Sequence, residues 1–112
     1  MIVGIGVDLV SLSRFSLNDE RFINKILGDD ELLLFNERKS DKRKLEFIAG
    51  RFAAKEAFFK ALGTGIGVIP LKELQILADE HNKPCIAFKE YKVHVSITHT
   101  EQDACSFVVI EK

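Results

Sequence analysis

Cysteine and proline are scarce in this 112-residue sequence, with two residues of each, and no long apolar segment occurs. Two cysteines, Cys85 and Cys105, are too few for the disulfide framework of a small secreted domain. No segment approaches the roughly 20 apolar residues that a membrane-spanning helix needs. The first residues carry no basic segment and reach Asp8 too early for a signal peptide. We therefore expect a cytoplasmic protein with reduced thiols and no membrane association.

An excess of charge of either sign is also missing, because 16 Lys and Arg face 17 Asp and Glu. A nucleic-acid binder held by phosphate contacts would usually be clearly basic, so we expect no nucleic-acid partner. Any anion must be bound by a local cluster of basic residues. The length and the 46% of apolar residues fit a single domain, residues 1–112, with a core of its own.

The first half of the chain predicts one strand and two short helices. Residues 2–10 are rich in Ile, Val and Leu and predict a buried strand, in which Gly4 and Gly6 let a backbone or a ligand come close. Apolar residues at helical spacing predict short helices over residues 18–27 and 30–38.

The strongest helix prediction covers residues 45–62, followed by Gly63 as the C-cap. Large apolar residues share one side of this helix: Ile48, Phe52, Phe59 and Leu62. Another side carries only small residues: Ala49, Gly50, Ala53 and Ala57. Glu56 and Lys60 flank the small side, and Arg51 and Lys55 form a second polar pair elsewhere on the helix.

The second half predicts short strands and a hairpin. Residues 64–67 form a loop, 71–78 and 85–88 are short strands, and residues 93–98 and 105–110 alternate as the arms of a hairpin. The expected fold class is α+β, with an antiparallel sheet packed on one long helix plus short helices.

Asp8 and Glu56 are the acidic residues of greatest interest. Asp8 alone could be an exposed strand end or a helix cap, and Glu56 alone could pair with Lys60. Two carboxylates from a buried strand and a mostly buried helix would repel unless a cation lay between them. Carboxylates completed by water and phosphate are typical ligands of Mg²⁺, and Lys60 would then neutralise phosphate.

The glycines and histidines give weaker evidence for a nucleotide-binding or metal site. The glycines of residues 63–67 follow a helix and lack a P-loop pattern, so Gly63 is more simply a helix cap. His94 and His99 lie five apart on a strand and face opposite sides, which argues against zinc. His99 is then a capping or surface group, or a donor to an anion at the rim of a cleft.

Two groups of basic residues could meet anions. The run 38–44 contains five Lys and Arg and is either a solvated approach to the long helix or, together with Arg51, a phosphate site. Arg14, Arg21 and Lys25 form a thin stripe near the first helix that suits an acidic partner surface.

Three motifs resemble those of the holo-acyl-carrier-protein synthases, the small bacterial 4′-phosphopantetheinyl transferases. They are residues 4–8 (GIGVD), residues 51–66 (RFAAKEAFFKALGTGI) and residues 95–100 (VSITHT), in order and at the expected spacing. The resemblance spans essentially the whole chain. It implies the 4′-phosphopantetheinyl transferase fold, a homotrimer with active sites between subunits, and transfer of 4′-phosphopantetheine from coenzyme A to a serine of acyl carrier protein.

The resemblance also implies roles for single residues. Asp8 and Glu56 would hold Mg²⁺ against the pyrophosphate of coenzyme A, and Lys60 would neutralise its bridging phosphates. Four residues match positions near the 3′-phosphate, some reaching it from a neighbouring subunit: Lys42, Arg43, Arg51 and His99. The glycines Gly63 and Gly65 would lie beside the pantetheine. Arg14, Arg21 and Lys25 would meet the acidic helix of the carrier protein.

Two points stay open at this level. Either Glu56 or a metal-bound water could accept the proton of the serine hydroxyl. The competing hypothesis is a non-catalytic module that uses its basic patches to bind an acidic protein or a nucleotide, but such a module has no use for Asp8 and Glu56 converging on one cation.

Overall fold

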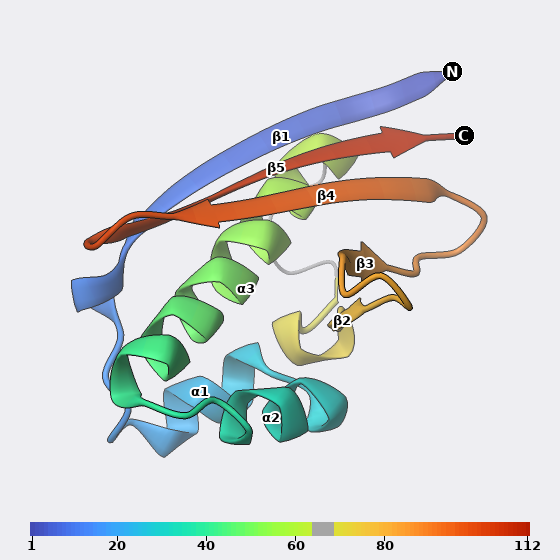
Figure 1. Cartoon of the computed structure of the whole chain (residues 1–112). Helices are drawn as coiled ribbons and strands as arrows, with labels where there is room; N and C mark the ends of the chain where they lie inside the picture. The colour runs from blue at the N-terminus through green and yellow to red at the C-terminus, as the bar shows by residue number, and fades with distance from the viewer. Residues whose placement is uncertain (64–68) are drawn as a thin grey trace.

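The molecule, described by a computed structural model over residues 1–63 and 69–112, has a three-stranded antiparallel sheet at one side and a long helix across it (Figure 1). The sheet, in the order β1-β5-β4, consists of β1 (Ile2–Ser11), β4 (Lys92–His99) and β5 (Asp103–Glu111). The helix is α3 (Asp41–Leu62). This arrangement confirms the predicted fold class.

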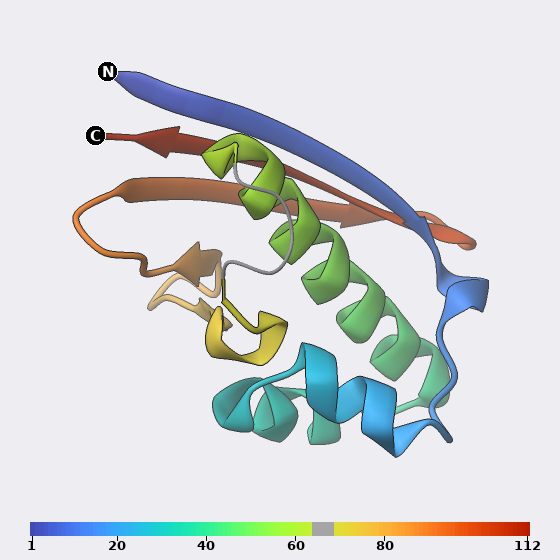
Figure 2. The ribbon, with the colours of Figure 1, turned by 180° about the vertical axis from the view of Figure 1, so that it is seen from behind.

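Smaller elements cover the side of α3 that faces away from the sheet, as the reverse view also shows (Figure 2). The helical ones are η1 (Leu12–Arg14), α1 (Glu20–Ile26), α2 (Asp29–Asn36) and η2 (Leu71–Glu73). A second sheet pairs β2 (Ile76–Ala78) with β3 (Pro84–Ile86). The two chain ends lie side by side, because the Met1 amino group donates to the Lys112 carbonyl.

Gly4 and Gly6 let β1 lie directly on the backbone of α3. A Cβ atom on Gly6 would sit 2.0 Å from the carbonyl oxygen of Ala57, and one on Gly4 would sit 1.8 Å from that of Ala61. Ala49, the neighbouring small residue on α3, is also fully buried. The prediction of a close backbone approach is therefore confirmed, and the small side of α3 is covered within the chain rather than left for a partner.

The outer face of β1 departs from the prediction of a buried strand. Residues at the inward positions, such as Gly6 and Val10, are buried, whereas Ile5, Val7 and Leu9 point outward and are 54–68% exposed. A continuous apolar run predicts burial on both faces. In the single chain one face is covered by α3 and the other is open.

The long helix begins earlier than predicted, at Asp41 instead of residue 45. Ser40 is its N-cap, since its side chain accepts a hydrogen bond from the Arg43 amide at 3.1 Å. Part of the basic run therefore forms the first turn of α3. The other end agrees with the prediction, because Gly63 adopts a left-handed conformation with φ of 83°.

Residues 71–78 do not form one strand as predicted. They divide into the 3₁₀ turn η2 and the short strand β2. Within the described ranges, none of the helices combines the length and the apolar character needed to cross a membrane.

Candidate active site

Asp8 and Lys60 lie together where β1 crosses the C-terminal half of α3. Asp8 occupies an inward position of β1, opposite Ser106 of β5, and its side chain is largely buried. The Lys60 ammonium group donates to Asp8 Oδ1 at 3.2 Å and to the Val7 carbonyl at 3.0 Å. Lys60 is thus held at the edge of the sheet with more than half of its side chain exposed.

Glu56, one turn before Lys60, completes an acidic cluster of Asp8, Glu56 and Lys60. Burial raises the pKa of Glu56, the negative charge of Asp8 raises it further, and Arg14 and Lys60 partly oppose the rise. Among the described residues Glu56 has no ion-pair partner, so the simple Glu56–Lys60 pair considered from the sequence does not form. The Lys60 ammonium group therefore pairs with Asp8, and the neighbouring carboxylate of Glu56 is left without an ion-pair partner in the described part of the chain.

The acidic cluster has the donor chemistry that Mg²⁺ requires. Mg²⁺ takes oxygen ligands and is usually bound through one or two carboxylates, with water and substrate phosphate in the remaining positions. In the described part of the chain no group of three or more His, Cys, Asp or Glu side chains could hold a metal by itself. Asp8 and Glu56 thus fit a magnesium ion that a phosphorylated ligand helps to coordinate.

A separate basic cleft of about 420 Å³ opens between the segment after α2, the first half of α3 and the end of β4. Its lining includes four cations, Arg38, Lys39, Arg43 and Arg51, together with His99 and the carboxylates of Glu37 and Glu46. The basic side chains outnumber the acidic ones, which suits an anionic ligand such as a phosphate.

Arg51 is the most restrained of these cations. Its Nε donates to the Ile76 carbonyl at 3.2 Å, and its guanidinium carbon lies 4.3 Å from the centre of the Phe47 ring. Burial lowers the pKa of Arg51 to about 10, which leaves the side chain charged at neutral pH. At the rim, His99 Nδ1 lies 3.5 Å from Glu46 Oε2.

The structure brings together some of the residues proposed from the sequence and separates others. Arg43, Arg51 and His99 share the basic cleft. Lys42 lies outside it and pairs with Glu101 in the turn between β4 and β5. Gly63 closes α3, whereas Gly65 falls outside the described residues.

The acidic cluster and the basic cleft lie at opposite edges of the sheet and at different heights along α3. Asp8 belongs to β1 and His99 to β4, the two outer strands of the sheet, with β5 between them. Along the helix, Glu46 at the cleft and Glu56 at the acidic cluster are ten residues apart, a rise of about 15 Å. The two halves of the candidate site in one chain therefore face different directions.

The three basic residues of the N-terminal stripe are exposed. Arg14 follows β1 and places its guanidinium 4.8 Å from the Phe52 ring, close enough to Glu56 to lower the pKa of that carboxyl. Arg21 and Lys25 lie on α1. Arg14 therefore borders the acidic cluster, and none of the three residues lines the basic cleft.

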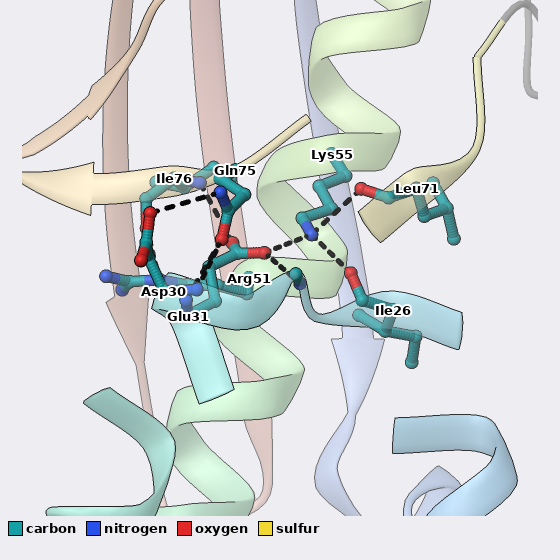
Figure 3. A network of polar contacts seen from close by, with 9 residues as sticks. Ile26, Asp30, Glu31, Arg51, Lys55, Leu71, Gln75 and Ile76 are labelled. Atoms are coloured by element: carbon teal, nitrogen blue, oxygen red, sulfur yellow. Dashed lines mark hydrogen bonds and ion pairs between the residues drawn. The ribbon is translucent and has the colours of Figure 1, made fainter. Parts of the chain in front are cut away.

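Lys55 and Glu31 form a buried ion pair that the sequence interpretation missed (Figure 3). Lys55 was expected to form a polar pair with Arg51, yet its Nζ lies 2.7 Å from Glu31 Oε1 and neither side chain is exposed. The helical spacing carried a signal, because Lys55 is three residues from Phe52 and four from Phe59, on the apolar side.

Comparisons with known proteins agree with this architecture. The model of the 4′-phosphopantetheinyl transferase superfamily matches residues 4–109. A relative from Staphylococcus haemolyticus, named holo-acyl-carrier-protein synthase, is 48% identical over 117 residues, which cover 100% of this chain and 98% of the relative.

Solved structures are similar over the same length. A holo-acyl-carrier-protein synthase from Bacillus anthracis, in complex with CoA (3′,5′-ADP), is 40% identical with a TM-score of 0.90 and covers 98% of this chain and 96% of its own. The corresponding synthase of Neisseria meningitidis is 35% identical with a TM-score of 0.87, and each chain is covered completely.

Proposed function

The chain belongs to the holo-acyl-carrier-protein synthases of the 4′-phosphopantetheinyl transferase superfamily, and we propose that it transfers 4′-phosphopantetheine from coenzyme A to a serine hydroxyl of apo acyl carrier protein. The reaction requires Mg²⁺ and releases adenosine 3′,5′-bisphosphate. The observation that carries the proposal is the pair of neighbouring carboxylates, Asp8 and Glu56, with Lys60 paired to Asp8 beside them.

Asp8 and Glu56 bind the cation, and Lys60 neutralises charge on the phosphates. When bound, Mg²⁺ supplies charge neutralisation for the pyrophosphate of coenzyme A as the phosphoryl group is transferred. Lys60 is already held at Asp8 and the Val7 carbonyl, and its exposed side chain can turn to a phosphate oxygen without leaving the cluster. Positioning and electrostatics account for most of the catalysis of phosphoryl transfer.

The serine hydroxyl must lose its proton during the attack. Glu56 is a candidate acceptor, because it is a carboxylate of the cluster at which the hydroxyl would attack. A water molecule of the metal shell is the alternative. In both cases the proton leaves toward the acidic cluster and the serine oxygen bonds to the phosphorus next to the pantetheine. The bond from that phosphorus to the bridging oxygen of the pyrophosphate breaks, and adenosine 3′,5′-bisphosphate leaves.

The adenosine 3′-phosphate binds in the basic cleft, where Arg43, Arg51 and His99 supply donors. Lys42 contributes from the rim once Glu101 releases it. Arg14, Arg21 and Lys25 receive the acidic helix of the carrier protein, because all three are exposed and Arg14 borders the acidic cluster. Gly63, at the end of α3, lies beside the pantetheine.

We propose a homotrimer with active sites shared between subunits. Two observations support it: the outer face of β1 exposes Ile5, Val7 and Leu9, which a partner would cover, and the two halves of the site lie at opposite edges of the sheet. Sedimentation should give the mass of three chains at micromolar concentration. A monomer under those conditions would contradict shared sites. The cytoplasmic location expected from the sequence stays a prediction.

Mass spectrometry tests the transfer directly. The protein is mixed with apo carrier protein, coenzyme A and Mg²⁺, and the carrier should gain the mass of one phosphopantetheine. A carrier whose conserved acceptor serine is replaced by alanine is the control and should stay unmodified. An unchanged mass of the apo carrier at every magnesium concentration would leave the non-catalytic binding module as the better account.

A further inference from the structure

The buried pair of Lys55 and Glu31 is connected to backbone on all sides (Figure 3). The Lys55 ammonium group donates to Glu31 Oε1 at 2.7 Å, to the Leu71 carbonyl at 3.0 Å and to the Ile26 carbonyl. Its three protons are therefore all used. Burial lowers the pKa of Lys55, and the charge and hydrogen bond of Glu31 oppose that change.

The Glu31 carboxylate is equally satisfied. Its Oε1 accepts from the Gly28 amide at 3.0 Å as well as from Lys55, and its Oε2 accepts from the Ile76 amide at 2.9 Å. A buried charge whose partners are removed is costly, so each of these contacts restrains the segment that supplies it.

The network joins five elements that belong to three separate segments of the chain. Ile26 ends α1, Gly28 caps α2, Leu71 begins η2 and Ile76 begins β2, while Lys55 itself belongs to α3. Next to the pair, Gln75 Oε1 accepts from the amides of Asp30 and Glu31 at 2.9 and 3.1 Å. These contacts attach the covering elements to one turn of α3.

That turn of α3 also carries Glu56, the residue after Lys55. The remaining contacts between α1 and α3 include rings such as Phe22 and Phe52, whose centres are 6.4 Å apart. Apolar contacts are non-directional and allow small shifts, whereas a hydrogen bond from Lys55 to the last residue of α1 fixes one distance. The ammonium group also suits the negative end of the α1 dipole.

We propose that Lys55 and Glu31 are positioning residues, which fix α1 and its basic side chains Arg21 and Lys25 relative to Glu56, so that the carrier protein is presented correctly to the acidic cluster. The inference rests on the proposed transfer to carrier protein. It assigns the pair a role beyond stability, because a buried ion pair can often be replaced by neutral residues without loss of stability.

The test uses the double variant Glu31→Gln/Lys55→Met, which leaves no unpaired charge in the core. The matched control is Phe58→Leu, at a fully buried residue of α3 outside the network. KM for carrier protein at saturating coenzyme A and Kd for coenzyme A are measured well below each melting temperature. We expect the KM for carrier protein to rise about tenfold or more in the double variant. The Kd for coenzyme A should stay close to wild type, and the control should change neither.

Several results would overturn the positioning role. They are an unchanged KM for carrier protein, an equal weakening of coenzyme A binding, or the same rise in KM for Phe58→Leu. If the double variant does not fold, Glu31→Asp, which keeps the charge but shortens the side chain, gives the same comparison, and failure of both to fold would mean that the pair is only structural. Carrier binding measured by calorimetry separates the two proposals: a wild type that binds carrier without modifying it contradicts the transfer, whereas unchanged binding by the variants contradicts the positioning.

Discussion

Lys55 and Glu56 are adjacent on α3, yet their surroundings differ completely. Lys55 is fully buried, and its ammonium group donates to one carboxylate and two carbonyls. Glu56 is half-buried beside a second carboxylate and has no ion-pair partner among the described residues. One residue step along the helix therefore separates a closed polar network from an open one.

The difference separates polar groups that hold the fold from polar groups that can bind a ligand. In the Lys55–Glu31 network every proton and each carboxylate oxygen has a protein partner, so nothing remains to bind a ligand. In the acidic cluster two like charges lie near each other, with Lys60 paired to Asp8 and Arg14 near Glu56. The repulsion between these charges lowers the stability of the free protein, and binding of a cation and phosphates removes that repulsion.

The largest expected effect comes from removing a carboxylate of the acidic cluster. Asp8→Asn and Glu56→Gln should fold normally and lose roughly 10²–10⁴-fold in turnover, the range typical for loss of a catalytic acid, base or metal ligand. The loss is measured by carrier modification across a magnesium titration. Near-native transfer by either variant, at any magnesium concentration, would mean that the open cluster is not the catalytic centre.

The second effect contrasts the two lysines. Lys55→Met leaves Glu31 charged in the core and should lower the free energy of unfolding by about 3–5 kcal/mol. Lys60→Met removes a largely exposed side chain and should cost less than about 1 kcal/mol. Denaturant titration of both variants measures the difference. Equal losses would show that the two networks do not differ in the way described.

Arg51 connects the buried core with the basic cleft. Its Nε donates to the carbonyl of Ile76, a residue of the Lys55–Glu31 network, and its side chain lines the cleft. Wild-type protein should bind coenzyme A about tenfold or more tightly than 3′-dephospho-coenzyme A, the scale of one charge-assisted hydrogen bond. Arg51→Lys should reduce that preference, as measured by calorimetry. Equal affinity of the wild type for the two ligands would remove the phosphate role of the cleft.

The smallest effect concerns stability as a function of pH. Burial and Asp8 raise the folded-state pKa of Glu56 above its usual 4.5, so between these two values the folded chain binds more protons than the unfolded chain. The contribution of Glu56 to the free energy of unfolding is therefore greatest below pH 4.5 and is lost as the pH rises through the folded-state pKa. Without Mg²⁺, Glu56→Gln should melt a few degrees higher than wild type at neutral pH.

Calorimetric scans at several pH values check this prediction. The advantage of Glu56→Gln should disappear in acid, where wild-type Glu56 is protonated, and it should shrink when Mg²⁺ and coenzyme A are added. A variant that melts below wild type at neutral pH without metal would indicate that the Glu56 charge stabilises the free protein.

Elements with a strong periodic pattern could be predicted from the sequence. The long helix with its Gly63 cap and the C-terminal hairpin follow from local spacing, and so does the close approach of β1 at Gly6. The division of residues 71–78 could not be predicted in this way. The Ile76 amide donates to Glu31, which is 45 residues away in the sequence, and Lys55 donates to the Leu71 carbonyl. These long-range contacts are not visible in the local pattern.

The candidate site was predictable to a similar extent. An acid on an apolar strand and an acid on a mostly buried helix indicated that Asp8 and Glu56 would meet, and their mutual effect on the pKa of Glu56 agrees. Lys55 was missed because a charged residue was assumed to avoid the core, although its spacing from Phe59 placed it there. The separation of the acidic cluster from the basic cleft depends on strand order, which no local pattern encodes.

The most direct test of the magnesium site is a crystal structure of the protein with coenzyme A and Mg²⁺. We expect carboxylate oxygens of both Asp8 and Glu56 within about 2.1 Å of one ion, with pyrophosphate oxygens among its other ligands. If the two side chains point apart, or the ion binds only to phosphate and water, the acidic cluster is not a metal site and the proposed mechanism is wrong.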